Sequence, residues 1–259
     1  MEENINISIK NLSFAYDKNL VLDDINLAFT KGNFYSIIGP NGSGKSTIIK
    51  NISKSLEPKG KSILIGDRDI CTLNNKSLSK IMATIPQRTI IDYDFTVSEI
   101  VMMGRSPHKK RFEDFNIEDE RIIKKYMKAT STWELKDKLI TELSGGEAQR
   151  VIAAKALSQE TDIVLLDEPT SNLDIQYQLE FLNTFRNLKI DKIIIAVLHD
   201  LNLASVFSDE IILINKGQVV AKGTPWDVIN EENIKNVYNI PVKIFENPIS
   251  KCPHIIPMV

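Results

Sequence analysis

The first patterned segment of the chain is residues 5–9, where apolar and polar side chains alternate. An alternation of period two is typical of a strand that buries one face and exposes the other. A second extended stretch follows at residues 20–29, and a third β-like run lies at residues 62–66. We therefore expect an antiparallel sheet near the start of the chain.

Three other runs are apolar without interruption, at residues 34–38, 163–166 and 193–198. Short runs of this kind are typical of parallel strands that helices cover on both faces. A glycine-rich turn separates the first run from a helical pattern that starts near Thr47, and residues 176–188 form a helical pattern between the other two runs. This order of strands and helices predicts a layered α/β core.

The middle of the chain, residues 87–158, has a different pattern. It lacks β-rich runs, and helical patterns such as residues 117–129 combine spaced apolar positions with Glu and Lys. Spaced apolar positions of this kind are typical of amphipathic helices. We expect one α/β domain over residues 1–259, in which residues 1–86 and 159–259 form the core with its antiparallel part and residues 87–158 form an inserted helical subdomain.

The composition excludes several classes of protein. The 32 basic and 34 acidic side chains nearly cancel, so no global field attracts nucleic acid or an anionic membrane. The two cysteines, Cys71 and Cys252, lack metal-ligand spacing. The acidic, polar start of the chain is unlike a secretory signal, and the longest apolar runs fall far below the ~18 residues of a membrane-spanning helix. We expect a protein that is not exported and does not itself cross a membrane.

The Walker A pattern of a phosphate-binding loop, G-x-x-x-x-G-K-[ST], is matched by residues 39–46 between a predicted strand and a predicted helix. Glycines let successive backbone N–H groups turn toward a polyphosphate, and the helix adds the positive end of its dipole. In this arrangement Lys45 reaches the β- and γ-phosphates, and the Ser46 hydroxyl binds the Mg²⁺ that bridges them. The loop alone fits kinases, GTPases and many molecular motors.

Two carboxylates, Asp167 and Glu168, directly follow the apolar run at residues 163–166. Because side chains alternate in direction along a strand, Asp167 is placed to hold the Mg²⁺ shell while Glu168 lies against a water in line with the γ-phosphate, as general base. Acidic residues after a strand are also common turn or capping groups. The phosphate loop upstream favours the catalytic interpretation.

The segment at residues 143–150, Leu-Ser-Gly-Gly-Glu-Ala-Gln-Arg, resembles the signature of ABC ATPases. Other elements of that family occur in order along the chain: Tyr16, the phosphate loop, Gln87, the signature, Asp167 and Glu168, residues 171–174 (Ser-Asn-Leu-Asp) and His199. The resemblance runs from about residue 12 to about residue 223. It implies an ABC-type fold: a P-loop NTPase core with an N-terminal antiparallel β subdomain and an inserted helical subdomain.

The resemblance also implies roles for individual residues. Two copies of the chain pack head to tail, and each ATP lies between the phosphate loop of one copy and the signature of the other. One copy contributes Tyr16, which stacks on adenine, and the loop residues Gly39, Pro40, Asn41, Gly42, Ser43, Gly44, Lys45, Ser46 and Thr47. The other copy contributes Ser144, Gly145, Gly146 and the interface residue Asp174. Ser46, Gln87 and Asp167 hold Mg²⁺, while Glu168, His199 and Gln87 act in catalysis.

Segments outside the ATP site resemble one branch of the family, the importers of iron–siderophore complexes, haem and cobalamin. They are residues 96–108, 199–204, 222–225 and 253–257. This resemblance implies a homodimer at the cytoplasmic face of the cell membrane, transmembrane permease subunits as partners and, indirectly, a substrate-binding protein. Residues 108–111, His-Lys-Lys-Arg, predict a solvated face; if they act, they dock the cytoplasmic helices of the permease.

Other functions stay open at this point. The chain could energise an exporter or an importer of another cargo, or it could be a cytosolic ABC ATPase that acts on DNA, RNA or ribosomes. The cytosolic class is disfavoured because about a hundred residues, without sustained heptads, separate the phosphate loop from the signature, and no basic stripe suggests nucleic acid. A scaffold that hydrolyses little ATP is disfavoured by Glu168, since such proteins lack the base.

Overall fold

The computed structural model describes residues 6–87, 93–171 and 173–258; Asn172 of the predicted segment 171–174 lies outside the described residues. The chain divides into two compact units, the first formed by Met1–Leu73 with Lys189–Val259 and the second by Asn74–Leu188. The expected helical subdomain, residues 87–158, falls inside the second unit, and its limits stay a prediction.

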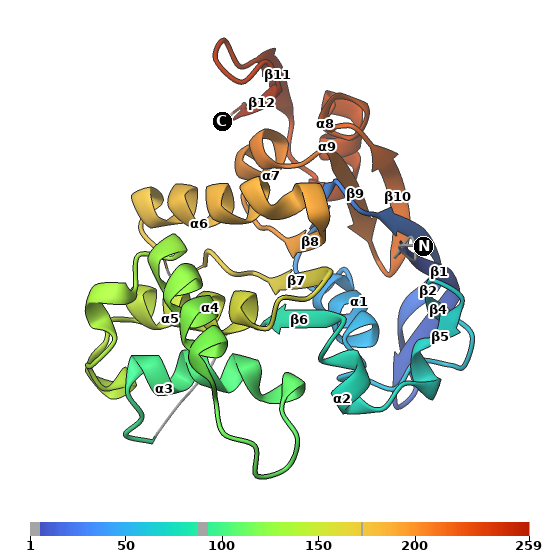
Figure 1. Cartoon of the computed structure of the whole chain (residues 1–259). Helices are drawn as coiled ribbons and strands as arrows, with labels where there is room; N and C mark the ends of the chain where they lie inside the picture. Colours follow the sequence, from blue (N-terminus) through green and yellow to red (C-terminus); the bar gives the residue numbers. More distant parts are fainter. Residues whose placement is uncertain (1–5, 88–92, 172, 259) are drawn as a thin grey trace. The chain divides into compact units, whose positions relative to one another are not determined.

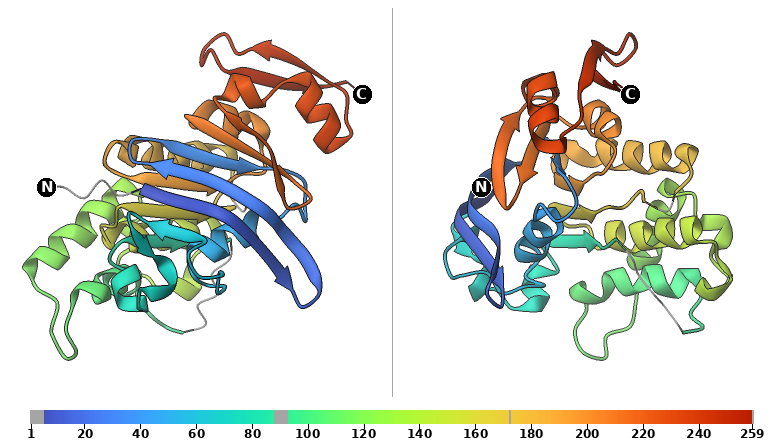
Figure 2. Two further views of the ribbon diagram at one scale, coloured as in Figure 1. Left: turned by 90° about the vertical axis from the view of Figure 1, so that its right-hand side faces the viewer. Right: turned by 180° about the vertical axis from the view of Figure 1, so that it is seen from behind.

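Strands dominate the first unit (Figures 1 and 2). Its elements are β1 (Asn6–Tyr16), β2 (Asn19–Thr30), β3 (Phe34–Ile38), α1 (Lys45–Ile52), β4 (Ile63–Ile65), β5 (Arg68–Asp69), the 3-10 turns Ile70–Thr72 and Lys189–Asp191, β8 (Ile193–Val197), α7 (Leu201–Phe207), β9 (Glu210–Asn215), β10 (Gln218–Gly223), α8 (Pro225–Val228), α9 (Glu231–Tyr238), β11 (Val242–Glu246) and β12 (Pro253–Pro257).

The predicted antiparallel sheet is present in the first unit, with strand order β2-β1-β4-β5. The left view of Figure 2 shows β1 and β2 running side by side over most of their length. Ile7 and Ile9 are buried while Ser8 between them is half-buried, as the alternation along this segment predicted. The sheet therefore follows directly from the period-two pattern.

A second set of strands in this unit has the order β10-β9-β3-β8. Strand β3 pairs in parallel with both β8 and β9, and β10 returns as a hairpin with β9. Every residue of β3 and β8 is buried, which confirms that the uninterrupted apolar runs are strands covered on both faces. Helix α1 begins at Lys45, two residues before the predicted start.

The second unit combines a parallel strand pair with helices. Its elements are α2 (Asn75–Leu78), β6 (Met82–Ile85), α3 (Val97–Met102), the 3-10 turns Met103–His108, Trp133–Leu135 and Ile140–Glu142, α4 (Ile117–Ala129), α5 (Gly145–Ser158), β7 (Ile163–Asp167) and α6 (Ile175–Leu188). Helices α3, α4 and α5 pack against one another (Figure 1), and α4 has the bounds that its apolar spacing predicted.

The interior of the second unit contains an ion-pair cluster. Asp119, at 3% exposure, pairs with Arg105 through Nε at 3.0 Å and with the Lys109 ammonium. Burial alone would raise the pKa of the Asp119 carboxyl, but hydrogen bonds from Lys109, the Asn116 backbone and Arg105 lower it to about 2. The predicted solvated face is therefore wrong for Lys109, which is buried because Asp119 ten residues downstream supplies its counter-charge.

Candidate functional site

The phosphate-loop residues lie between β3 and α1 in the first unit. Gly39 has φ +153, and a Cβ on it would lie 2.1 Å from the Ile214 carbonyl oxygen. Gly44 has φ +107 and precedes α1, and a Cβ there would lie 2.7 Å from Leu22 Cδ2. Both positions therefore require glycine, because a side chain would clash and L-residues rarely adopt this backbone.

Lys45 is held inside this loop. Its Nζ donates to the Gly39 and Pro40 carbonyl oxygens, at 2.9 Å each, and only 5% of the residue is exposed. The neighbouring Ser43 hydroxyl is buried and has no hydrogen-bond partner among the described residues, while Ser46 is half-buried and Thr47 buried. A buried ammonium, an unpaired hydroxyl and a helix N-terminus together fit a polyphosphate ligand.

The outer side of the loop is supported by the β9–β10 hairpin turn. The Gly217 N–H donates to the Ser43 carbonyl at 3.0 Å, and the Gly217 carbonyl accepts from the Asp23 N–H at 2.9 Å. A groove here is lined by loop, turn and α9 residues: Pro40, Asn41, Gly42, Ser43, Asn215, Lys216, Asn236, Val237 and Asn239. In α9, burial raises the pKa of the Tyr238 phenol, and the nearby Gly39 backbone acts in the opposite direction.

His199 lies at the same sheet edge as the loop. Strands β3 and β8 are parallel, with Ile37 opposite Val197, and the Leu198 N–H donates to the Ile37 carbonyl at 3.3 Å. The carboxyl ends of the two strands are therefore adjacent, which places exposed His199 beside the segment that starts at Gly39. This edge of a parallel sheet is where ligands of α/β folds bind.

Tyr16 ends β1, opposite Asn19 of β2. Its ring packs edge to face on Phe14, with 5.1 Å between ring centroids, and 41% of the residue is exposed. An exposed, braced aromatic ring offers a surface for stacking. The geometry is thus compatible with the adenine contact that the sequence resemblance implied.

In the second unit, Gln87 and Glu168 meet beyond the ends of neighbouring strands. Strands β6 and β7 are parallel, with Ile85 opposite Leu166, and the Gln87 amide Nε2 donates to Glu168 Oε2. Asp167, the last residue of β7, is buried. The structure therefore brings these three predicted site residues to one edge of the strand pair.

The direction of Glu168 has a different origin from the one predicted. Strand β7 ends at Asp167, and Glu168 has φ +50 in the left-handed region. A turn, and not the alternation of side chains along the strand, therefore sets the direction of the Glu168 side chain. A non-glycine residue in this conformation carries backbone strain, which concentrates at functional sites.

The signature segment forms the N-terminus of α5. Ser144 is the N-cap, and a capping box joins it to Glu147. A surface pocket here is lined by Ser144, Gly145, Gly146, Glu147, Arg150, Asp174 and Tyr177. The structure thus brings Asp174 to the three signature residues, although thirty positions separate them along the chain.

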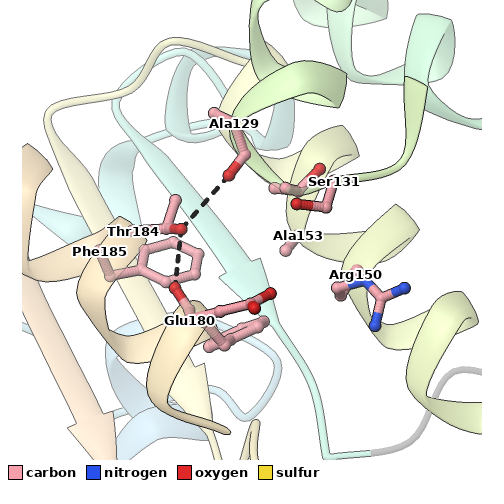
Figure 3. Close-up of a pocket in the computed structure, with 9 residues that line it drawn as sticks. Ala129, Ser131, Arg150, Ala153, Glu180, Thr184 and Phe185 are labelled. Carbon is pink, nitrogen blue, oxygen red and sulfur yellow. Dashed lines mark hydrogen bonds between the residues drawn. The ribbon is translucent and has the colours of Figure 1, made fainter. Parts of the chain in front are cut away.

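A second, smaller pocket of this unit lies among α4, α5 and α6 and contains none of the predicted site residues. It is lined by Ala129, Thr130, Ser131, Arg150, Ala153, Glu180, Phe181, Thr184 and Phe185. Figure 3 shows Thr184 bonded to the carbonyl groups of Ala129 and Glu180, while the Arg150 guanidinium points away from Thr184 and Phe185. Arg150 thus lines this pocket and also the signature pocket.

The predicted Mg²⁺ ligands are the hydroxyl of Ser46 in the first unit and, in the second, the Gln87 amide and the Asp167 carboxylate. All three supply oxygen donors, and Mg²⁺ is usually held by one or two carboxylates together with substrate phosphates and water. No cluster of three or more His, Cys, Asp or Glu side chains suited to a metal occurs within residues 6–87, 93–171 and 173–258. Each of these three oxygen donors is of the kind that Mg²⁺ prefers.

A family model described as ABC transporter matches residues 22–171, more than half of the chain. The chain belongs to the ABC transporter family. The iron(3+)-hydroxamate import ATP-binding protein FhuC of Bacillus subtilis (strain 168) is 37% identical over 249 residues, which are 95% of this chain and 93% of that protein. The prediction that the chain belongs to this family, made from the signature and the other motifs, is confirmed.

Solved ABC transporter structures resemble most or nearly all of the chain. An inward-facing transporter described as metal-chelate type matches with a TM-score of 0.84 and 25% identity, over 99% of this chain and 98% of that one. A bacterial ABC transporter cassette solved as a dimer matches with a TM-score of 0.74 and 27% identity, over 84% of this chain and 98% of that one. The predicted ABC ATPase fold is confirmed.

This ABC transporter chain is an ATPase subunit that binds ATP and hydrolyses it for transport. Subunits of this kind associate with permeases and dimerise. Across the part of the chain that the structure describes, no helix has the length and apolar character to cross a bilayer.

Several residues of this ABC ATPase site were not predicted from the sequence. The link between Glu147 and Ser144 has a local signal, because Ser-x-x-Glu before a helix is a capping-box pattern. The approach of Tyr177 to Arg150 and of Tyr238 to Gly39 has none. These pairs are distant in sequence, so only the folded chain reveals them.

Proposed function

We propose that this ATPase energises an importer of iron chelates, such as siderophore complexes or haem, or of cobalamin. Two identical copies act at the cytoplasmic face of the membrane, beneath permease subunits that receive cargo from a substrate-binding protein. The observation that supports this cargo class most strongly is the similarity to an iron(3+)-hydroxamate import protein over 95% of the chain. The segments outside the ATP site that resemble this branch, residues 96–108, 199–204, 222–225 and 253–257, support the same cargo class.

The phosphate loop supplies the binding half of the proposed mechanism. The glycine-shaped backbone of residues 39–44 turns N–H groups toward the phosphates, and Lys45 exchanges its bonds to the Gly39 and Pro40 carbonyls for phosphate oxygens. Thr47, in the first turn of α1, continues the phosphate-binding segment, and Tyr16 stacks on the adenine. Ser46, Gln87 and Asp167 would hold Mg²⁺, which would offset the negative charge of the phosphates.

The catalytic half is assigned to Glu168, Gln87 and His199. Glu168 takes the proton of the attacking water as general base, and the Gln87 amide, which bonds to Glu168, orients that water. His199, at the sheet edge beside the loop, contacts the γ-phosphate. Ser144, Gly145 and Gly146 of the second copy complete the site from the N-terminus of α5, with Asp174 at the interface.

The assignment of Glu168 is tested by the Glu168→Gln variant with Mg·ATP. We expect a stable ATP-bound dimer in sedimentation and turnover reduced about a thousandfold, because the amide cannot accept the proton. Glu160→Gln is the matched control, since Glu160 also follows an element of the second unit with φ +51. A Glu168→Gln chain that stays monomeric and hydrolyses ATP like the parent would rule out the proposed base.

The cargo class is tested through the membrane partner. Purification of the full complex from its own cells should yield a permease, and vesicles containing that complex should accumulate an iron chelate or cobalamin when ATP is present on the ATPase side. Accumulation of an unrelated solute would reject the cargo class but keep the transport function. Recovery of ribosomes or DNA in place of a permease would reject the transport assignment.

A further inference from the structure

The donors of the signature site are already bonded to a carboxylate of the same chain. The Ser144 hydroxyl and the Ser144 N–H both donate to Glu147 Oε2, at 2.8 and 2.9 Å, and the Glu147 N–H donates back to the Ser144 hydroxyl at 3.3 Å. Ser144 is exposed and Glu147 half-buried, so this closed arrangement lies at the surface. An incoming anion would find the hydroxyl occupied.

The charges around this site also oppose an anion. The pocket contains two carboxylates, Glu147 and Asp174, but one guanidinium, that of Arg150. The Arg150 guanidinium stacks 4.2 Å from the centroid of the Tyr177 ring, and its Nε has no hydrogen-bond partner among the described residues. One cation therefore faces two carboxylates before any ligand arrives.

Glu147 is ionised in this arrangement. The backbone hydrogen bond from Ser144 and then the side-chain hydrogen bond from Ser144 lower the pKa of the Glu147 carboxyl, and the charges of Lys138 and Arg150 act in the same direction. A carboxylate at a helix N-terminus is further favoured by the helix dipole. The group that now accepts hydrogen bonds from Ser144 is thus a fully charged carboxylate.

We propose that Glu147 is a built-in competitor for the phosphate of the partner copy's ATP: its carboxylate holds Ser144 until the phosphate displaces it. The inference rests on the proposed function, in which Ser144, Gly145 and Gly146 receive that phosphate. Glu147 acts through Ser144 and is therefore a positioning residue. It touches neither the attacking water nor the scissile bond.

Two physical effects follow from this competition. Closure of the dimer exchanges one ionised acceptor of the Ser144 hydroxyl for another, so the new hydrogen bond adds little net affinity. The displaced carboxylate also stays near the phosphate and repels it. Both effects raise the ATP concentration needed for pairing, and the return of Glu147 to Ser144 after hydrolysis favours reopening.

The test measures the ATP concentration that gives half-maximal dimer in sedimentation. The parent is the full-length Glu168→Gln chain, in which bound ATP persists. Adding Glu147→Gln removes the charge but keeps the side-chain length and an acceptor for the cap. We expect the half-maximal ATP concentration to fall about five- to tenfold, the range of one charge-assisted hydrogen bond and its repulsion; Glu147→Ala should change it in the same direction.

The chain offers a closely matched control at the start of α3. There, Thr96 N–H and Thr96 Oγ1 both donate to Glu99 Oε2 at 2.8 Å, and the Glu99 N–H donates to Thr96 Oγ1 at 3.3 Å. Glu99→Gln removes the charge from the same kind of cap in the same unit and leaves the signature unchanged. We expect equal shifts of the thermal unfolding midpoint in the two variants, and a changed ATP requirement only for Glu147→Gln.

The outcomes separate this inference from the function on which it rests. A parent that fails to pair with ATP would reject the proposed function, and the competitor role with it. A parent that pairs with ATP, combined with a Glu147→Gln variant that needs as much ATP or more, would overturn the competitor role alone. An equal gain in Glu99→Gln would do the same, because the effect would then come from loss of a cap.

Discussion

Two helix N-termini are assigned to the nucleotide under the proposed function, and their first residues differ. Helix α1 has Gly44 as its N-cap, with no side-chain cap and no acidic residue in its first turn. Helix α5 has Ser144 as its N-cap, with a capping box and with Glu147 in its first turn. The two helix dipoles have the same sign, so the difference lies in what the sequence places at each end.

This difference implies that the α1 site binds phosphate more tightly than the α5 site. At α1, the N-cap Gly44 has no side chain to compete for the first N–H groups of the helix, and buried Lys45 adds a positive charge. At α5, the N–H groups of Ser144 and Glu147 already donate to each other's side chains before a ligand arrives. Under the proposed function, ATP therefore stays with its own copy through the cycle, while the partner's signature holds it only in the closed dimer.

The largest effect should come from removing the cation of the α1 site. We expect Lys45→Ala to lower ATP turnover about a thousandfold, equivalent to about 4 kcal/mol of transition-state stabilisation, because no other buried ammonium reaches the loop among the residues described. Steady-state phosphate release measures it. Lys50→Ala, an exposed change in the same helix, is the control. A Lys45→Ala rate within tenfold of the parent would contradict the assignment.

The next effect concerns the backbone of the loop. We expect Gly39→Ala to destabilise the fold by about 3 kcal/mol, because its Cβ would meet the Ile214 carbonyl oxygen at 2.1 Å and the residue would be strained. Urea unfolding measures the change. Gly32→Ala isolates the strain, since Gly32 has φ +90 but no atom within 4 Å of the added Cβ, and should cost about 1 kcal/mol. Equal losses in both variants would show that the clash is relieved.

The smallest effect on stability should occur at the α5 site. Gly145 lacks a left-handed φ, and an added Cβ meets nothing within 4 Å, so Gly145→Ala should change the free energy of unfolding by no more than about 0.5 kcal/mol. Under the proposed function the same methyl group fills the space that the partner's phosphate needs. ATP-driven pairing in the Glu168→Gln background should then weaken at least about tenfold. Normal pairing would show that the phosphate does not approach Gly145.

Local patterns were sufficient for much of the fold and for the residue types of the site. Uninterrupted apolar runs identified β3 and β8, period-two alternation identified β1, and the spacing of glycines with Lys45 identified the phosphate loop. In each case one short segment carries the physical requirement, either burial on both faces or a backbone that only glycine adopts. Such requirements are visible without knowing the rest of the chain.

Features that depend on distant partners could not be predicted in this way. Nothing in the run from His108 to Arg111 shows that Lys109 is buried, because its counter-charge comes from Asp119. The left-handed backbone of Glu168 is likewise absent from a pattern that treats the strand as regular. The capping box of Ser144 and Glu147 is an intermediate case. Its Ser-x-x-Glu spacing can be recognised in the sequence, but its effect on ligand binding depends on the signature site in the folded chain.

The bonds of Lys45 to its own loop have a thermodynamic consequence. Because two carbonyl oxygens at 2.9 Å solvate the Lys45 ammonium, Lys45 is not an isolated buried charge, and its hydrogen bonds help to hold the loop in shape. When nucleotide binds, Lys45 exchanges its hydrogen bonds to the loop carbonyls for hydrogen bonds to phosphate oxygens. The loop already has its shape, so binding does not have to order it. Association should consequently carry a small conformational-entropy penalty, so that nucleotide can exchange rapidly between rounds of transport.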